Sequence, residues 1–157
     1  MESNVIEIEF IKKTAESISV VLWDYIQEDK FTHFFSVFVA EQEVENRQEI
    51  CDIILSLADF FSFEKATLIY AFGLLDAFIT ATKSHLTSKN ILLTFLTALI
   101  ISMKFNEDNI LNSKYICSCL GLEKEQLGTM EIVFLEGIKY KAMISRKKFE
   151  EYKEYFW

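Results

Sequence analysis

Proline is absent from this chain of 157 residues, and glycine occurs only four times. At the average usage of about 5% proline, a chain of this length would carry roughly eight. Strand-rich folds and loop-rich secreted scaffolds use both residue types in their turns. The composition therefore predicts an all-α protein, made of long helices that short loops connect.

The length and the apolar content predict a single folded domain. Apolar residues make up 51% of the chain, which is too high for a disordered protein. A chain this long buries roughly 70% of its unfolded surface, so its core needs no disulfide or metal. The three cysteines are an odd number, and Cys117 and Cys119 are too close for an easy bridge, so free thiols in a reducing compartment are expected. The acidic N-terminus does not resemble a signal peptide. We expect an intracellular protein, in the cytoplasm, the nucleus or both.

The charge balance disfavours two classes of partner. With 24 acids against 16 bases, the net charge of −8 repels nucleic acid and anionic membrane surfaces. The uncharged stretch at residues 91–103 is shorter than the roughly 20 residues of a membrane span, so it predicts a helix buried on all sides. The glycines never cluster into a phosphate-binding loop. We expect no nucleic-acid, membrane or small-molecule ligand.

Apolar residues recur at three- and four-residue steps through most of the chain, which is the spacing of amphipathic helices. Ser88, Ser113 and Ser145 are expected to cap three of these helices. The Phe-rich residues 30–44 have weak periodicity and are assigned to a helix only loosely. The other expected helices cover residues 5–28, 46–61, 64–82, 89–104, 113–121, 123–138 and 146–156.

The residues that usually carry catalysis do not form a recognisable pattern. The two histidines, His33 and His85, lie far in sequence from each other and from any cysteine, so zinc is not expected. Two cysteines at the spacing of Cys117 and Cys119 on a short helix are more often core or surface residues than metal ligands. Cys51 has no nearby histidine as a base. We predict no catalytic residue, no metal and no cofactor, and therefore no enzyme.

Three charged residues lie among apolar residues. Asp76 interrupts LIYAFGLLDAFI, Lys104 closes the buried helix, and Glu131 comes directly after Met130 on the apolar face of its helix. A carboxylate among apolar neighbours must be paired, because an unpaired buried charge costs several kcal/mol. Each of these residues alone would be read as an ordinary boundary charge.

Together, the segments resemble the cyclin box. RQEICDIILSLADFF and TLIYAFGLLDAFI are similar to its first two helices, LLTFLTALIISMKFNED to its third, and TMEIVFLEGIKYKAMISRKKFEEY to its fifth helix and the segment after it. The resemblance implies an N-terminal helical extension at residues 1–45 and, at residues 46–157, a single five-helix box with a C-terminal helix. The positions typical of cyclin boxes are Arg47, Asp76, Leu93, Lys104 and Glu131.

The chain also departs from the cell-cycle cyclins, which carry two boxes. A single box is more similar to the short cyclins of the fungal nutrient-responsive and plant types. In the first helix, Asn46 and Glu49 stand where the substrate-docking groove of the family is apolar, and Ile53 replaces the usual Trp. The usual Asp-Arg pair of the second helix is Asp76-Ala77 here. We therefore expect the docking groove to be lost.

The resemblance implies a regulatory subunit that binds a cyclin-dependent protein kinase and activates it by docking on the kinase αC helix. In the family, Arg47 and Asp76 would form a structural ion pair, while Lys104 and Glu131 would lie side by side and contact the kinase backbone. An apolar pocket around them would contain Ile101, Phe105, Leu135 and Tyr140. The alternative is a cyclin-fold scaffold or adaptor that activates no kinase, similar to the retinoblastoma pocket domains.

Overall fold

A computed structural model describes residues 2–26, 35–40, 42–106 and 113–157. Within these residues the only β-type pairing is an isolated bridge between Ile26 and Leu86. The all-α prediction is therefore confirmed. The elements are α1 (Glu2–Asp24), the 3-10 turn η1 (Ser36–Phe38), α2 (Arg47–Phe61), α3 (Lys65–Thr82), α4 (Ile91–Asn106), α5 (Ser113–Leu120), α6 (Lys124–Gly137) and α7 (Arg146–Phe156).

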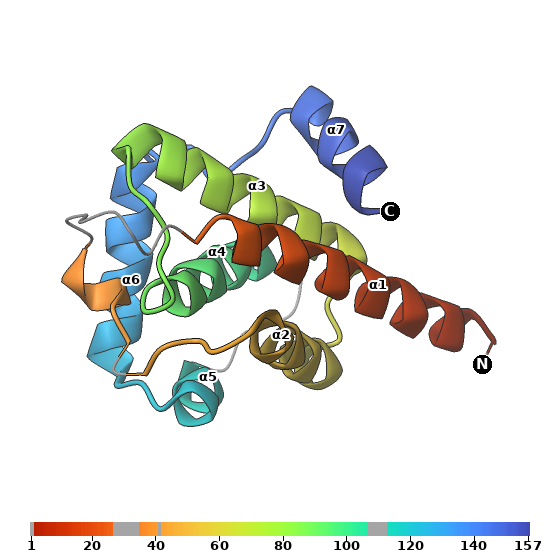
Figure 1. The fold of residues 1–157 in the computed structure, drawn as a ribbon, viewed down its shortest axis with the longest axis horizontal. Helices are drawn as coiled ribbons and strands as arrows, with labels where there is room; N and C mark the ends of the chain where they lie inside the picture. Colours follow the sequence, from red (N-terminus) through yellow and green to blue (C-terminus); the bar gives the residue numbers. More distant parts are fainter. Residues whose placement is uncertain (1, 27–34, 41, 107–112) are drawn as a thin grey trace.

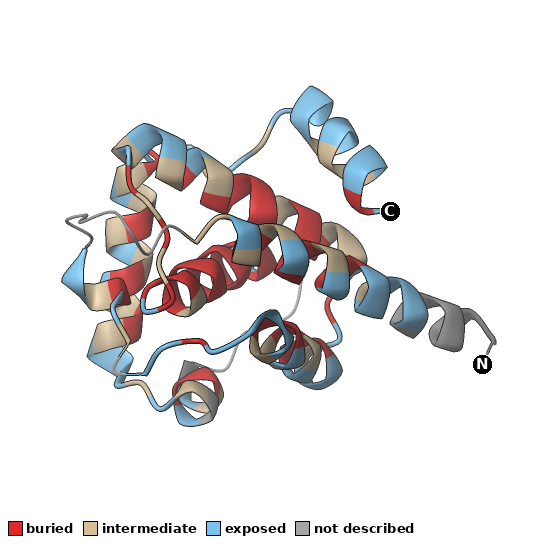
Figure 2. Cartoon of the chain, viewed as in Figure 1, coloured by how far each residue is buried: buried red, intermediate tan, exposed pale blue. Residues whose placement is uncertain are grey.

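Helix α4 lies at the centre of the molecule, as its uncharged sequence predicts. Every residue from Leu93 to Met103 is buried, and Figure 2 shows the helix mostly in the buried colour, among the other helices. Helix α3 packs along it, and α6 packs against it on another side (Figure 1). Burying an apolar face is the main source of helix stability in a protein, so α4 organises the core around itself.

Helix α3 is the one described helix that is long and apolar enough, by length and composition, to cross a membrane. Half of this helix is buried inside the fold. It packs on α1, α4, α6 and α7. Contact with four other helices accounts for its apolar sequence, because a core helix must be apolar on most of its circumference.

Helix α1 belongs to the same core as the later helices. Its residues Ala15, Ile18 and Leu22 are fully buried, and the helix packs on α2 and α3. The segment that the family resemblance sets apart, residues 1–45, thus contributes to the common hydrophobic cluster. The division of the chain at residue 46 stays a prediction about family resemblance.

Two local expectations are wrong. The loosely assigned helix at residues 30–44 is absent from its described part, which contains only the short turn η1. Helix α4 begins at Ile91, so Ser88 lies too early to cap it; Asn90 precedes the helix instead, and its Oδ1 accepts from the N–H of Thr87 at 2.8 Å. The predicted cap at Ser113 concerns a side chain outside the described residues. Ser145 does cap α7, since its Oγ accepts from the N–H of Lys148 at 3.2 Å.

Candidate partner-binding surface

The last turn of α4 and the middle of α6 meet through an ion pair. Lys104 Nζ lies 2.6 Å from Glu131 Oε1, although 27 positions separate the two residues. The expected adjacency of this pair is therefore present. Lys104 also lies at the C-terminal end of α4, where the helix dipole stabilises a cation.

Both members of the pair remain accessible, but unequally. The side chain of Lys104 is 44% exposed and that of Glu131 is 18% exposed. Their bond uses one of the three ammonium donors and one of the two carboxylate oxygens. The remaining hydrogen-bonding capacity of an ammonium and a carboxylate can meet the backbone of another molecule.

Large apolar side chains are exposed on the residues next to this pair. Phe105 comes directly after Lys104 and is 62% exposed, and Ile132 comes directly after Glu131 and is 53% exposed. Exposed apolar side chains beside charged ones are typical of a protein–protein contact. Sequence reasoning missed Ile132, although its position directly after Glu131 could have drawn attention to it.

The predicted apolar pocket around the pair is only partly formed by exposed residues. Tyr140 is 64% exposed, and Leu135 is half-buried against the core. Ile101 is only 2% exposed. Ile101 lies one helical turn before Phe105, where the core covers α4, so it adds no exposed surface, and its place in the pocket stays a prediction. We name the exposed surface of Lys104, Phe105, Glu131, Ile132 and Tyr140 the α4–α6 surface.

The backbone just after α6 is strained. Lys139 and Tyr140 both have positive φ, at 55° and 59°. Non-glycine residues reach the left-handed region at a cost of roughly 1–2 kcal/mol each. The turn is held by a 2.7 Å hydrogen bond from the Tyr140 N–H to the Leu135 carbonyl. It sends the chain from α6 along α3 toward α7 (Figure 1).

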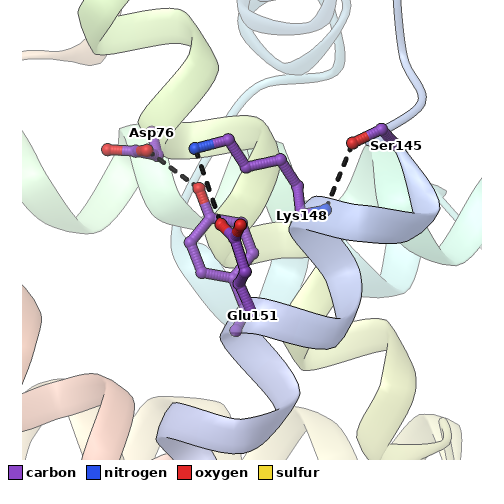
Figure 3. Close-up of polar contacts among 5 residues, drawn as sticks. Asp76, Ser145, Lys148 and Glu151 are labelled. Atoms are coloured by element: carbon purple, nitrogen blue, oxygen red, sulfur yellow. Dashed lines mark hydrogen bonds and ion pairs between the residues drawn. The ribbon is translucent and has the colours of Figure 1, made fainter.

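Asp76 does not pair with Arg47 as predicted. Arg47 is exposed at the first turn of α2, and the two side chains form no ion pair. Helix α2 packs chiefly on α1, which separates it from most of α3, so the two charges face different neighbours. Asp76 instead accepts a 2.9 Å hydrogen bond from the hydroxyl of Tyr152 in α7 (Figure 3).

Aromatic contacts complete the attachment of α7 to α3. Phe149 stacks on Tyr70 with ring centroids 4.8 Å apart. Phe72 makes edge contacts with Tyr152 and Phe156. Burial raises the pKa of the Tyr152 hydroxyl well above its usual range, and the Asp76 carboxylate raises it further. Asp76 thus has a structural role, but its partner comes from the last helix of the chain and not from the first helix of the box.

The described residues contain no cluster of three or more His, Cys, Asp or Glu side chains that could hold a metal ion. Cys51 and Cys117 are buried free thiols. Burial raises the pKa of the Cys51 thiol, with Glu16 adding to the effect. A raised thiol pKa lowers the thiolate fraction and hence the reactivity.

Comparison with known families agrees with the arrangement of the helices. The family model described as "Cyclin, N-terminal domain" matches residues 22–142. The match begins within α1 and ends after α6, so it includes Leu93, which is buried in α4, and both residues of the Lys104–Glu131 pair. No curated protein matches the chain. Because the family model covers more than half of the chain and the fold is all-α, the chain belongs to the cyclin family.

Proposed function

We propose that this protein is a regulatory subunit, without catalysis of its own, that binds and activates a cyclin-dependent protein kinase. The contact would be made by the α4–α6 surface on the kinase segment that leads into the αC helix. We place this role inside the cell, in the cytoplasm, the nucleus or both. The cyclin-box family supports the class of partner.

The observation that carries the proposal is the contact between Lys104 and Glu131. A 2.6 Å ion pair fixes a donor and an acceptor at one point of the surface. Backbone carbonyls can accept from the ammonium, and backbone N–H groups can donate to the carboxylate. Such charge-assisted hydrogen bonds are roughly twice as strong as neutral ones. The exposed side chains of Phe105, Ile132 and Tyr140 would add the apolar anchors on which interfaces depend.

Activation requires only that the subunit prefers one conformation of the kinase. A protein kinase is active when its αC glutamate meets the ATP-binding lysine. A rigid partner that binds the inward αC helix more tightly than the outward one shifts the population toward the active state. The well-buried α4, from whose end Lys104 projects, provides a rigid base for such a contact.

The experiment is to measure kinase binding and activity with Lys104→Ala and Glu131→Ala. Candidate kinases come from a pull-down with the wild-type chain from its native cell, identified by mass spectrometry. Circular dichroism checks that each variant is folded. We expect each variant to lose binding by about tenfold or more, since removing one partner of an interfacial charged contact typically costs about 2–5 kcal/mol. Lys124→Ala and Glu125→Ala, at exposed positions in the first turn of α6, are the matched controls.

A charge swap distinguishes a role of the Lys104–Glu131 pair in kinase binding from a role only in the stability of the protein. The double variant Lys104→Glu, Glu131→Lys keeps an ion pair between the two helices but exchanges donor and acceptor toward the kinase. We expect it to fold, to lose no more than about 1 kcal/mol because a glutamate at the end of α4 opposes the helix dipole, and to fail to bind. Restored binding in the swapped variant would refute the proposal, because the pair would then act only inside the protein. Binding without any rise in kinase activity would favour the adaptor alternative.

A further inference from the structure

The segment from Lys139 to Lys148 differs in charge from the rest of the molecule. It contains five bases and no acid, which leaves eleven bases against all 24 acids elsewhere in the chain. All five basic residues are exposed. We name this segment the basic strip. It begins after α6, runs past α3 and ends in the first turn of α7 (Figure 1).

The middle of the basic strip alternates between exposed and inward-facing residues. Lys141, Met143 and Ser145 are exposed, whereas Ala142 and Ile144 pack against the core. This alternation is the pattern of an extended chain. Ile144 is the anchor, because a Cβ on Gly73 of α3 would lie only 2.8 Å from its Cγ2 atom. The strip is therefore fixed on one side and open on the other.

Its backbone is unpaired on the open stretch. Among the described residues, the N–H groups of Ala142, Met143 and Ile144 donate to no protein acceptor. An extended segment with free backbone groups is the geometry on which another chain can add as a strand. Met143 is 83% exposed, so it offers an apolar contact at the same place.

The charge determines which chain would fit. In a molecule of net charge −8, a surface with five bases and no acid attracts acidic groups, while the rest of the surface repels them. The bases lie at both ends of the strip, Lys139 and Lys141 before Met143 and Arg146 to Lys148 after it. A complementary peptide would have acidic residues on both sides of an apolar one. The Lys148–Glu151 contact, at 3.9 Å between exposed side chains, is too weak to neutralise the strip.

We propose that the basic strip binds an extended acidic segment of a partner protein, through its exposed bases, its unpaired backbone and Met143. This function does not depend on kinase docking by the α4–α6 surface, although Tyr140 belongs to both surfaces. Because they share Tyr140, the two surfaces adjoin, and one partner complex could use both.

The test uses the isolated full chain and a fluorescein-labelled peptide that has glutamates on both sides of a central leucine. Fluorescence anisotropy gives the dissociation constant. We expect binding to weaken at least about tenfold in the strip variant and to weaken with salt, because exposed charges are screened. The strip variant carries Lys139→Gln, Lys141→Gln, Arg146→Gln, Lys147→Gln and Lys148→Gln.

A matched variant removes the same number of charges elsewhere. We expect the matched variant to bind the peptide like the wild type. We expect the same of Lys104→Ala, so that peptide binding by the strip is distinguished from kinase docking by the α4–α6 surface. Met143→Ser is expected to weaken binding without loss of stability, since its side chain touches little of the protein. The matched variant carries Lys12→Gln, Lys13→Gln, Lys83→Gln, Lys89→Gln and Lys124→Gln, all at exposed positions.

Four results would count against the proposal. Equal affinity of the wild type and the strip variant would do so, as would equal binding of a peptide with lysines in place of the glutamates. Inorganic phosphate could also displace the peptide at an ionic strength at which sodium chloride leaves the peptide bound. That result would show that the strip binds anions in general and not an acidic peptide. Hydrogen exchange at Ala142 to Ile144 should slow in the complex, and unchanged exchange would exclude strand pairing.

Discussion

The hydroxyl of Tyr152 donates a 2.9 Å hydrogen bond to Oδ2 of Asp76, across 76 positions of the chain. The bond joins the last helix to the middle of α3, at a place where both side chains are half-buried. It satisfies a carboxylate that would otherwise be costly among apolar neighbours. Asp76 therefore helps to hold α7 on the fold.

Removing Asp76 should destabilise the protein, whereas removing Arg47 should not. Asp76→Ala leaves the Tyr152 hydroxyl without its acceptor, which typically costs about 1–3 kcal/mol. Arg47→Ala changes an exposed residue, so we expect a change within about 0.5 kcal/mol. Urea unfolding monitored by circular dichroism measures both. A loss in Arg47→Ala as large as that in Asp76→Ala would contradict this assignment.

The tyrosines around Asp76 should make the protein less stable in alkali. Burial and the Asp76 carboxylate raise the pKa values of Tyr25 and Tyr152 in the folded protein. In the unfolded chain a tyrosine loses its proton at about pH 10. Above that pH the unfolded state is ionised while the folded state is not, so the free energy of unfolding falls as the pH rises.

Urea unfolding at a series of pH values between about 8 and 11 would measure this slope. We expect Tyr152→Phe to make the slope shallower, because it removes one of the groups with a raised pKa. Tyr140→Phe is the control, since that side chain is largely exposed. An identical slope in the wild type and Tyr152→Phe would show that Tyr152 does not contribute.

Glycine substitutions should distinguish close helix contacts from open surface. A Cβ at Gly73 would lie 2.8 Å from Ile144 Cγ2, and a Cβ at Gly137 would collide with the ring of Phe78. A Cβ at Gly128 would meet nothing within 4 Å. We expect Gly128→Ala to stabilise the protein by about 0.5–1 kcal/mol, the usual gain within a helix. Gly73→Ala and Gly137→Ala should lower the midpoint of thermal unfolding, and a gain in either would show that the side chain of Ile144 or Phe78 can move aside without cost.

Basic-hydrophobic docking peptides should bind weakly or not at all at the start of α2. Asn46 Oδ1 accepts from the N–H of Glu49, and Glu49 Oε2 accepts from the N–H of Glu45. Both polar side chains therefore cap the N-terminal end of α2. A docking groove works by burying apolar anchors, each worth roughly 1.5–3 kcal/mol. Isothermal calorimetry with such a peptide would test this. Micromolar binding there would show that the register of the first box helix has been misread.

The sequence by itself determined the helical architecture. The predicted ranges of all seven described α-helices agree with the structure within a few positions, because the spacing of apolar residues in an amphipathic helix follows the face that is buried. The uncharged run at residues 91–103 predicted the central helix for a different reason, since a helix that is apolar on every side is buried all round. The adjacency of Lys104 and Glu131 had a different source, the resemblance to the cyclin box, since no local periodicity connects residues that are 27 positions apart.

Only the tertiary structure decided which side chains meet. Asp76 could have been paired with any base near an apolar face, and its true partner became apparent only with α7 in place on α3. Ile101 and Phe105 are both apolar residues one turn apart on α4, yet one is buried and the other is largely exposed. The physical reason is that periodicity describes the contacts within one helix, whereas partners and exposure depend on how separate helices pack around one another.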